Sequence, residues 1–216
     1  MLFDLAVERA TFLSIIGPSG AGKSTLLSLI GGFEQPLKGQ VLVDGADITR
    51  LAPAERPCTT LFQDHNLFAH LDVERNVALG IDPNLRLSKD QRAEVRQALA
   101  DVGLAGMEHR LPGQLSGGER QRAAIARCLV RHRPILLLDE TFAAVGPGLR
   151  REMLDLVRAL QARLGLTVIM VTHDPGDARH AGGRTAFVDA GRVVLVEGTE
   201  RVLASTMPEV RAYLGN

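Results

Sequence analysis

The chain has 216 residues, of which 45% are hydrophobic, so it can bury a sizeable core in a single compact domain. Its 25 basic and 25 acidic residues cancel, which argues against a global field that attracts nucleic acid or an anionic membrane. Cys58 and Cys128 lie far apart, with no C-x-x-C pair or clustered histidines, so we expect reduced, partly buried thiols rather than a disulfide framework or a zinc site. No apolar run approaches the roughly eighteen residues of a membrane-spanning helix, and any membrane role is expected to be peripheral.

Hydrophobic periodicity and turn residues predict strands that alternate with helices. The expected strands are residues 1–9 (at a sheet edge), 12–16, 40–43 (in a hairpin), 59–62, 134–139, 167–171, and the hairpin pair 184–189 and 192–196. The expected helices are residues 23–31, 73–79, 88–102, 118–132, 147–164 and 202–214. This alternation predicts an α/β fold as one domain over residues 1–216. Its helical subdomain is expected at residues 67–133, where strands are missing, and its core at residues 1–66 and 134–216.

Residues 17–25, here called the phosphate loop, read GPSGAGKST between an apolar strand and a helix. They match the pattern G-x-x-x-x-G-K-[ST] in the structural context that this pattern requires. Gly20 and Gly22 let the backbone curl, so that amide N–H groups and the helix N-terminus face one anion. Lys23 adds a positive charge for the β- and γ-phosphates, and Ser24 adds a hydroxyl ligand for Mg²⁺. A glycine-rich turn that ends in Lys-Ser by chance is the alternative, and the context favours ATP binding.

Two adjacent carboxylates, Asp139 and Glu140, follow the apolar run ILLL. Neighbouring side chains at a strand end point in opposite directions, so the two can hold different roles. Asp139 suits the outer coordination shell of Mg²⁺, whereas Glu140 suits a general base that polarises water near the γ-phosphate. Two solvated carboxylates at a strand edge are the alternative. Downstream of a phosphate loop, we favour the catalytic interpretation.

Residues 115–121, here called the signature segment, read LSGGERQ. Alone, a serine and two glycines at a helix start are a common N-cap, but they also form an anion-binding arrangement. Together with the phosphate loop, Gln63, residues 136–140 and His173, this segment has the order and spacing of the ATP-binding-cassette (ABC) transporter ATPases. The chain resembles that family over nearly its whole length. The resemblance implies a P-loop NTPase core with a mixed sheet and a helical signature-motif subdomain.

The same resemblance implies the site residues. Each ATP is expected to lie between the phosphate loop of one chain and the signature segment of a second chain in a head-to-tail homodimer. The implied nucleotide-binding residues are Gly17, Pro18, Ser19, Gly20, Ala21, Gly22, Lys23, Ser24, Thr25, Ser116, Gly117, Gly118 and Glu119. The implied catalytic residues are Lys23, Gln63, Glu140 and His173, and the implied Mg²⁺ ligands are Ser24, Gln63 and Asp139.

Two stretches of the sequence point to one subfamily of the ABC transporter ATPases. Residues 55–80 (ERPCTTLFQDHNLFAHLDVERNVALG) and 126–140 (ARCLVRHRPILLLDE) are most similar to the ATPase subunit of bacterial thiamine importers. The implied location is peripheral, at the cytoplasmic face of the inner membrane. The implied partners are a transmembrane permease, contacted by Leu67 and Phe68 unless these belong to the helical core, and indirectly a periplasmic solute-binding protein; nucleic acid is not among them. The alternatives are an importer ATPase for polyamine, iron or another small solute, a non-transport cassette ATPase, and a degenerate regulator that binds nucleotide only.

Three features depart from the family pattern. Only sixteen residues precede Gly17, without the aromatic residue that stacks on adenine in the family, which predicts an internal start at Met1 and weaker ATP binding. Thr141 replaces the usual proline after Glu140. Gly146 replaces an aspartate that, in the family, bridges the two halves of the dimer. For the Gly146 replacement, we expect nucleotide binding to survive, with looser coupling of dimer closure to hydrolysis.

Overall fold

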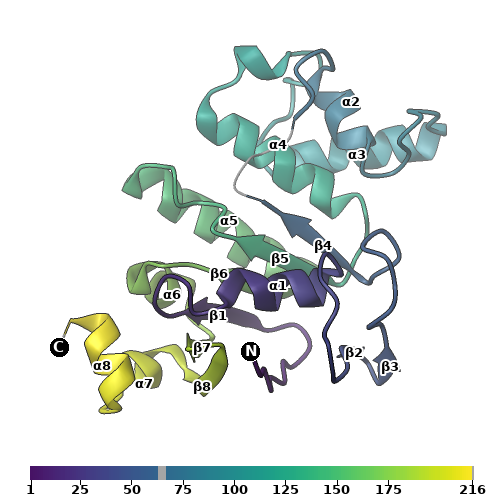
Figure 1. Ribbon diagram of the computed structural model, residues 1–216. Helices are drawn as coiled ribbons and strands as arrows, with labels where there is room; N and C mark the ends of the chain where they lie inside the picture. Colours follow the sequence, from purple (N-terminus) through teal and green to yellow (C-terminus); the bar gives the residue numbers. More distant parts are fainter. Residues whose placement is uncertain (63–66, 216) are drawn as a thin grey trace.

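The computed structural model describes residues 1–62 and 67–215. Its centre is a six-stranded sheet with the order β4-β5-β6-β1-β7-β8 (Figure 1). The strands are β1 (Phe12–Ile16), β4 (Cys58–Leu61), β5 (Ile135–Asp139), β6 (Thr167–Val171), β7 (Arg184–Asp189) and β8 (Arg192–Gly198). The strands from β4 to β7 run parallel, and β8 pairs with β7 in the antiparallel direction. The predicted α/β fold with a mixed sheet is thereby confirmed.

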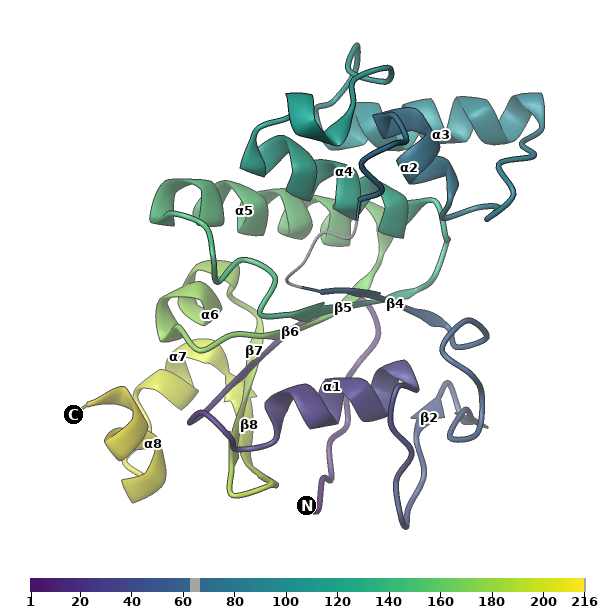
Figure 2. The same ribbon diagram turned by 45° about the horizontal axis from the view of Figure 1, so that its top comes forward.

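Helices cover both faces of this sheet. Successive side chains of a strand point to opposite faces, and in β5 Leu136 and Leu138 pack into the core that contains α4 (Gly117–Leu129) and α5 (Pro147–Leu164). Leu137 instead packs into the core that contains α1 (Lys23–Gly31). Figure 2 shows α1 on one side of the sheet and α4 and α5 on the other. Burial on both faces explains why the parallel strands read as continuous apolar runs.

A group of helices lies at one end of the molecule, and of its members α4 also packs on the sheet. It consists of α2 (Val73–Ala78), α3 (Lys89–Asp101) and the neighbouring α4 (Figure 1). The amide of Gln91 donates to the Ser88 hydroxyl and the Ser88 amide to the Gln91 side chain, a capping box that starts α3 one residue after Ser88. Val95 and Leu99 of α3 are fully buried, so the predicted amphipathic helix is confirmed.

Two predicted elements differ from the structure. Residues 1–9 form no strand and have a single bridge between Leu2 and Arg192, because Phe3, Leu5 and Val7 pack against the core under α1 instead of pairing along an edge. Residues 202–214 do not form one helix but end α7 (Thr199–Leu203) and form α8 (Pro208–Leu214). Pro208 separates them, since proline lacks an N–H and disfavours the helical conformation of the residue before it.

Three further differences are smaller. The predicted hairpin near residues 40–43 is a separate two-stranded sheet of β2 (Leu42–Val43) and β3 (Ala46–Asp47). The strand predicted at residues 59–62 lies one residue earlier, as β4. Among the described residues, two helical segments were not predicted: the single-turn 3-10 helix η1 (Pro112–Gln114) and α6 (Pro175–Ala181). In α6, Asp174 accepts a hydrogen bond from the Gly176 amide as the N-cap, and Pro175 occupies the first helical position.

The two cysteines are free, as predicted, and both are buried rather than partly buried. Burial raises the pKa of the Cys128 thiol to about 11, so this thiol stays protonated at neutral pH. Across residues 1–62 and 67–215, no helix has both the length and the apolar character that spanning a membrane requires.

Candidate functional site

The phosphate loop leaves the carboxyl end of β1 and enters α1. Gly17 has a φ of +148°, and a Cβ built there lies 1.9 Å from the carbonyl oxygen of Val188 in β7. Only glycine fits between these strands, because any side chain would collide with backbone. Gly22 has a φ of +98° and is the N-cap of α1, so the loop turns sharply at both ends. The loop therefore presents its amides and the α1 N-terminus at the sheet edge where parallel strands end.

The amino group of Lys23 lies over this loop. Its Nζ donates to the carbonyl oxygens of Gly17 and Pro18, each at 2.8 Å, and the residue is only 6% exposed. Burial lowers the pKa of Lys23, while the charges of Glu140 and Asp139 raise it. A cation fixed above the anion-binding backbone gives this edge its positive charge.

The carboxyl end of β5 meets the start of α1. The Ser24 hydroxyl donates to Oδ1 of Asp139 at 2.9 Å, a contact between residues 115 positions apart. Burial raises the pKa of Asp139, the Ser24 hydrogen bond lowers it, and the neighbouring Glu140 raises it further. A hydroxyl oxygen and a carboxylate oxygen lie side by side here, and hard divalent cations prefer oxygen ligands of both kinds.

Glu140 and His173 face each other from neighbouring strand ends. The Glu140 amide donates to the carbonyl of Val171 at 3.2 Å, and the backbone at Glu140 adopts a left-handed φ of +44°. Nδ1 of His173 lies 3.8 Å from Oε2 of Glu140. The side chains are 51% and 37% exposed respectively, so both reach the solvent beside the phosphate loop. A carboxylate and an imidazole at this position can accept and donate a proton next to a bound phosphate.

Sequence reasoning missed a residue that joins the loops carrying this pair. Arg150 in α5 donates to Oδ2 of Asp174 at 3.0 Å and to the carbonyl of Ala143 at 3.1 Å. Its side chain is 17% exposed. Arg150 thus links the segment after Glu140 to the segment after His173. Residue spacing in the sequence does not predict these contacts of Arg150, because they depend on how α5 packs against the neighbouring loops.

Thr141, where the family resemblance implies a proline, is 3% exposed and hydrogen-bonded. Its hydroxyl donates to the carbonyl of Leu61 at the end of β4 at 2.9 Å, and its own carbonyl accepts from Nε2 of Gln121 in α4 at 3.3 Å. Proline has no hydroxyl for the first contact. The replacement therefore ties the segment after Glu140 to β4, the strand that precedes Gln63. Gln63 itself lies outside the described residues.

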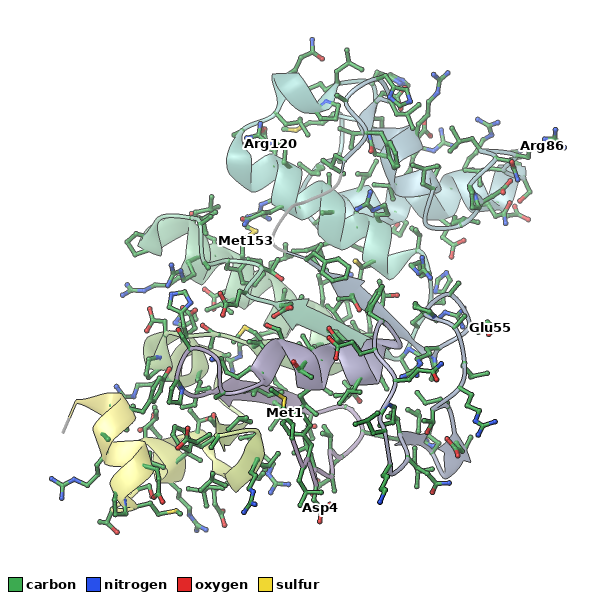
Figure 3. The ribbon with its side chains drawn as sticks, viewed as in Figure 1. Met1, Asp4, Glu55, Arg86, Arg120 and Met153 are labelled. Carbon is green, nitrogen blue, oxygen red and sulfur yellow. The ribbon has the colours of Figure 1, made fainter. Side chains whose placement is uncertain are left out.

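The signature segment starts α4 one residue earlier than predicted. Ser116 and Glu119 form a capping box in which each amide donates to the other's side chain. These hydrogen bonds lower the pKa of Glu119. Figure 3 shows Arg120, which follows the capping box, in the helical group. Met1, which lies against Gly22 of the phosphate loop, is at the opposite side of the view. The segment therefore does not meet the phosphate loop of its own chain.

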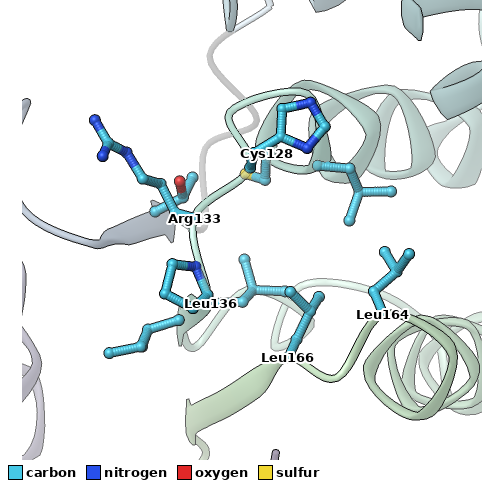
Figure 4. A pocket seen from close by; sticks show the side chains of 10 residues that line it. Cys128, Arg133, Leu136, Leu164 and Leu166 are labelled. Atoms are coloured by element: carbon cyan, nitrogen blue, oxygen red, sulfur yellow. The ribbon is translucent and has the colours of Figure 1, made fainter. Parts of the chain in front are cut away.

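A cavity of about 320 Å³ lies elsewhere, between α4, α5 and the strands (Figure 4). It is lined by Thr59, Cys128, Leu129, His132, Arg133, Pro134, Ile135, Leu136, Leu164 and Leu166. Thr59 and Ile135 belong to the amino-terminal halves of β4 and β5, whereas the phosphate loop follows a carboxyl end. Ligands of open α/β sheets bind beyond the carboxyl ends of the strands, so this cavity is not the nucleotide site.

Comparisons with known proteins agree with this geometry. The sequence profile of the ABC transporter family matches residues 2–143. The chain is 55% identical over 216 residues to the thiamine import ATP-binding protein ThiQ of Chelativorans sp. (strain BNC1). The aligned region covers 100% of this chain and 88% of that protein.

Solved structures give the same result. The structure of cbiO1 from Clostridium perfringens, part of the ABC transporter complex cbiONQ, superposes with a TM-score of 0.85 and 30% identity over 93% of this chain and 82% of that one. The dimeric post-hydrolysis state of the ATP-binding cassette MJ0796, bound to ADP and Pi, gives a TM-score of 0.75 and 33% identity over 90% of this chain and 88% of that one. From its fold, its phosphate-loop geometry and its relatives, the chain belongs to the ABC transporter family, as one of the ATP-hydrolysing cassettes of that family.

Proposed function

We propose that the chain is the ATPase subunit of a bacterial importer, and that thiamine is the imported solute. One observation carries the assignment of the reaction: the side chains of Lys23, Asp139, Glu140 and His173 gather at the carboxyl edge of the sheet beside the phosphate loop. The similarity to thiamine import proteins over the whole chain supports the choice of solute.

In the proposed reaction, Lys23 and the loop amides hold the phosphates. Glu140 accepts a proton from the attacking water, and His173 donates a hydrogen bond to the γ-phosphate. The 3.8 Å between the two side chains suits groups that face one bound phosphate. Arg150 keeps the segments that carry them together through Ala143 and Asp174.

The residues present fit a magnesium ion. Ser24 Oγ and Asp139 Oδ1, 2.9 Å apart, offer the hard oxygen donors that Mg²⁺ prefers. We propose that these two residues hold the ion, with Gln63 as a further ligand from outside the described residues. When bound, the ion supplies positive charge to the phosphate oxygens.

The proposed active unit is a homodimer. Within one chain the signature segment lies in the helical group, away from its own phosphate loop (Figure 3). Ser116, Gly117, Gly118 and Glu119 can therefore meet a phosphate only if it is held by another copy. In a head-to-tail dimer, the signature segment of each copy faces the phosphate loop of the other. The γ-phosphate then contributes contacts between the two copies only in the closed state.

A membrane permease is the other proposed partner. Phe68 is 50% exposed in the segment before α2, and Phe33 and Phe62 are 51% and 40% exposed as an edge-to-face pair with ring centroids 5.3 Å apart. Exposed aromatic side chains suit a partner helix better than water. Leu67 packs against the helical core, so for this residue the core interpretation holds. Docking on such a permease would keep the chain at the cytoplasmic face of the inner membrane, with a periplasmic solute-binding protein on the far side.

The substrate is tested by uptake. Deleting the gene is expected to abolish high-affinity uptake of labelled thiamine, and the intact gene should restore uptake, whereas a Lys23→Ala gene should not. Normal thiamine uptake with lost uptake of a polyamine or iron would instead support an importer for that solute. ATP hydrolysis by the purified complex excludes the regulator that only binds nucleotide.

Gly146 offers a direct test of the dimer contact. It is the N-cap of α5 with a φ of −62°, and a Cβ there meets no atom within 4 Å, so aspartate fits without strain. Gly146→Asp is expected to raise the turnover of the assembled transporter by up to about a hundredfold, because a misplaced water costs on the order of that factor. The affinity for ATP should change little.

Turnover and nucleotide affinity are measured for wild type and Gly146→Asp side by side. Gly148→Asp is the matched control, because this position is equally open and lies two residues further along the same helix start. Equal turnover in all three proteins would mean that the loop has another dimer contact and that Gly146 is a tolerated variation.

A further inference from the structure

The only tyrosine of the chain, Tyr213, reaches the loop that carries His173. Tyr213 lies in α8, and its hydroxyl donates to the backbone carbonyl of His173 at 2.8 Å. Its ring packs on Phe187 of β7, with centroids 5.6 Å apart and planes tilted by 55°. Phe187 is fully buried, so the ring is held by the core while the hydroxyl points to the site.

The same hydroxyl also lies next to the phosphate loop. Burial raises the pKa of Tyr213, and the nearby backbone of Gly17 lowers it. Gly17 is the first residue of the phosphate loop and is itself pressed against Val188, the neighbour of Phe187. The tyrosine therefore binds the His173 backbone and lies near the start of the phosphate loop, although α8 contributes no residue to the predicted site.

We propose that Tyr213 is a positioning residue for ATP hydrolysis. Its hydroxyl holds the His173 backbone against the phosphate loop, so full turnover requires α8 to be docked on β7. This inference rests on the role of His173 proposed above. Because the hydroxyl donates to a backbone carbonyl, its effect runs through the position of the histidine.

The test uses Tyr213→Phe in the full chain assembled with its permease. Phenylalanine keeps the ring on Phe187 and removes only the hydroxyl. The loss of one hydrogen bond predicts a fall in kcat of about two- to tenfold, with the KM for ATP unchanged within about twofold. Arg211→Gln, at an exposed position of the same helix, is the matched control and should hydrolyse ATP like wild type.

His173→Ala separates a failure of the role proposed for His173 from a failure of the positioning role proposed for Tyr213. If His173→Ala hydrolyses ATP like wild type, the site assignment itself is wrong. If His173→Ala is slow but Tyr213→Phe matches wild type in kcat, the site stands and the positioning role of Tyr213 is overturned. A Tyr213→Phe effect confined to KM overturns it as well.

A second measurement does not depend on a variant. Tyr213 is the single tyrosine, so biosynthetic 3-fluorotyrosine places one ¹⁹F label at this position. Binding of adenylyl imidodiphosphate with Mg²⁺ is expected to shift its resonance, because the nucleotide orders the phosphate loop and the His173 backbone on either side of the hydroxyl. A resonance that stays unchanged at saturating nucleotide would contradict the contact.

Discussion

Replacing Glu140 by glutamine is expected to slow ATP hydrolysis by about 10²–10⁴-fold, which corresponds to roughly 3–5 kcal/mol in the barrier. Glutamine has the shape of the carboxylate but cannot accept a proton from water. The phosphate loop and the Ser24–Asp139 contact do not involve this side chain, so ATP binding should remain. The variant is expected to accumulate as an ATP-bound dimer, visible by size-exclusion chromatography.

The control for the Glu140 variant is another carboxylate. Glu8 is 77% exposed beside Arg184 and is not one of the site residues, so Glu8→Gln should hydrolyse ATP like wild type. Unchanged turnover of Glu140→Gln in the assembled transporter would remove Glu140 as the base. Slow turnover of both variants would point to a general effect of lost charge.

Replacing Gly17 by alanine is expected to damage both the fold and the site. The new Cβ would lie 1.9 Å from the Val188 carbonyl, and the φ of +148° is a conformation that alanine avoids. Because backbone cannot move aside as a flexible side chain can, we expect a loss of about 2–5 kcal/mol in the free energy of unfolding. Any relaxation must shift the start of the phosphate loop, so ATP binding should fall as well.

Urea unfolding and nucleotide titration measure the two effects. Gly148→Ala is the control, since its Cβ meets no atom within 4 Å and its backbone lies in an ordinary helical conformation. Alanine there should be neutral or stabilise the protein by up to about 1 kcal/mol. If Gly17→Ala unfolds at the same urea concentration as wild type, the close approach of the loop to β7 is not a constraint on the protein.

Hydrophobic periodicity and turn residues, which are local features of the sequence, predicted most of the helices and strands. The bounds of β6, β7 and α5 match the expectation at both ends. For α5 the residues at its two ends explain this: Pro147 occupies the first helical position, and Gly165, with its left-handed backbone, ends the helix. Where local signals were misread, the errors were also local. The apolar residues before β1 pack without pairing, and Pro208 splits the C-terminal helical segment.

The sequence by itself determined the strand–loop–helix around Lys23, the carboxylates after β5 and the α/β class, because these follow from residue types at short spacing. Only the tertiary structure decided which side chains from other elements hold the loop that carries His173. Arg150 reaches Asp174 across 24 positions, and Tyr213 reaches His173 across 40. Such contacts depend on how α5 and α8 pack on the sheet, and packing is a property of the whole core rather than of any one segment.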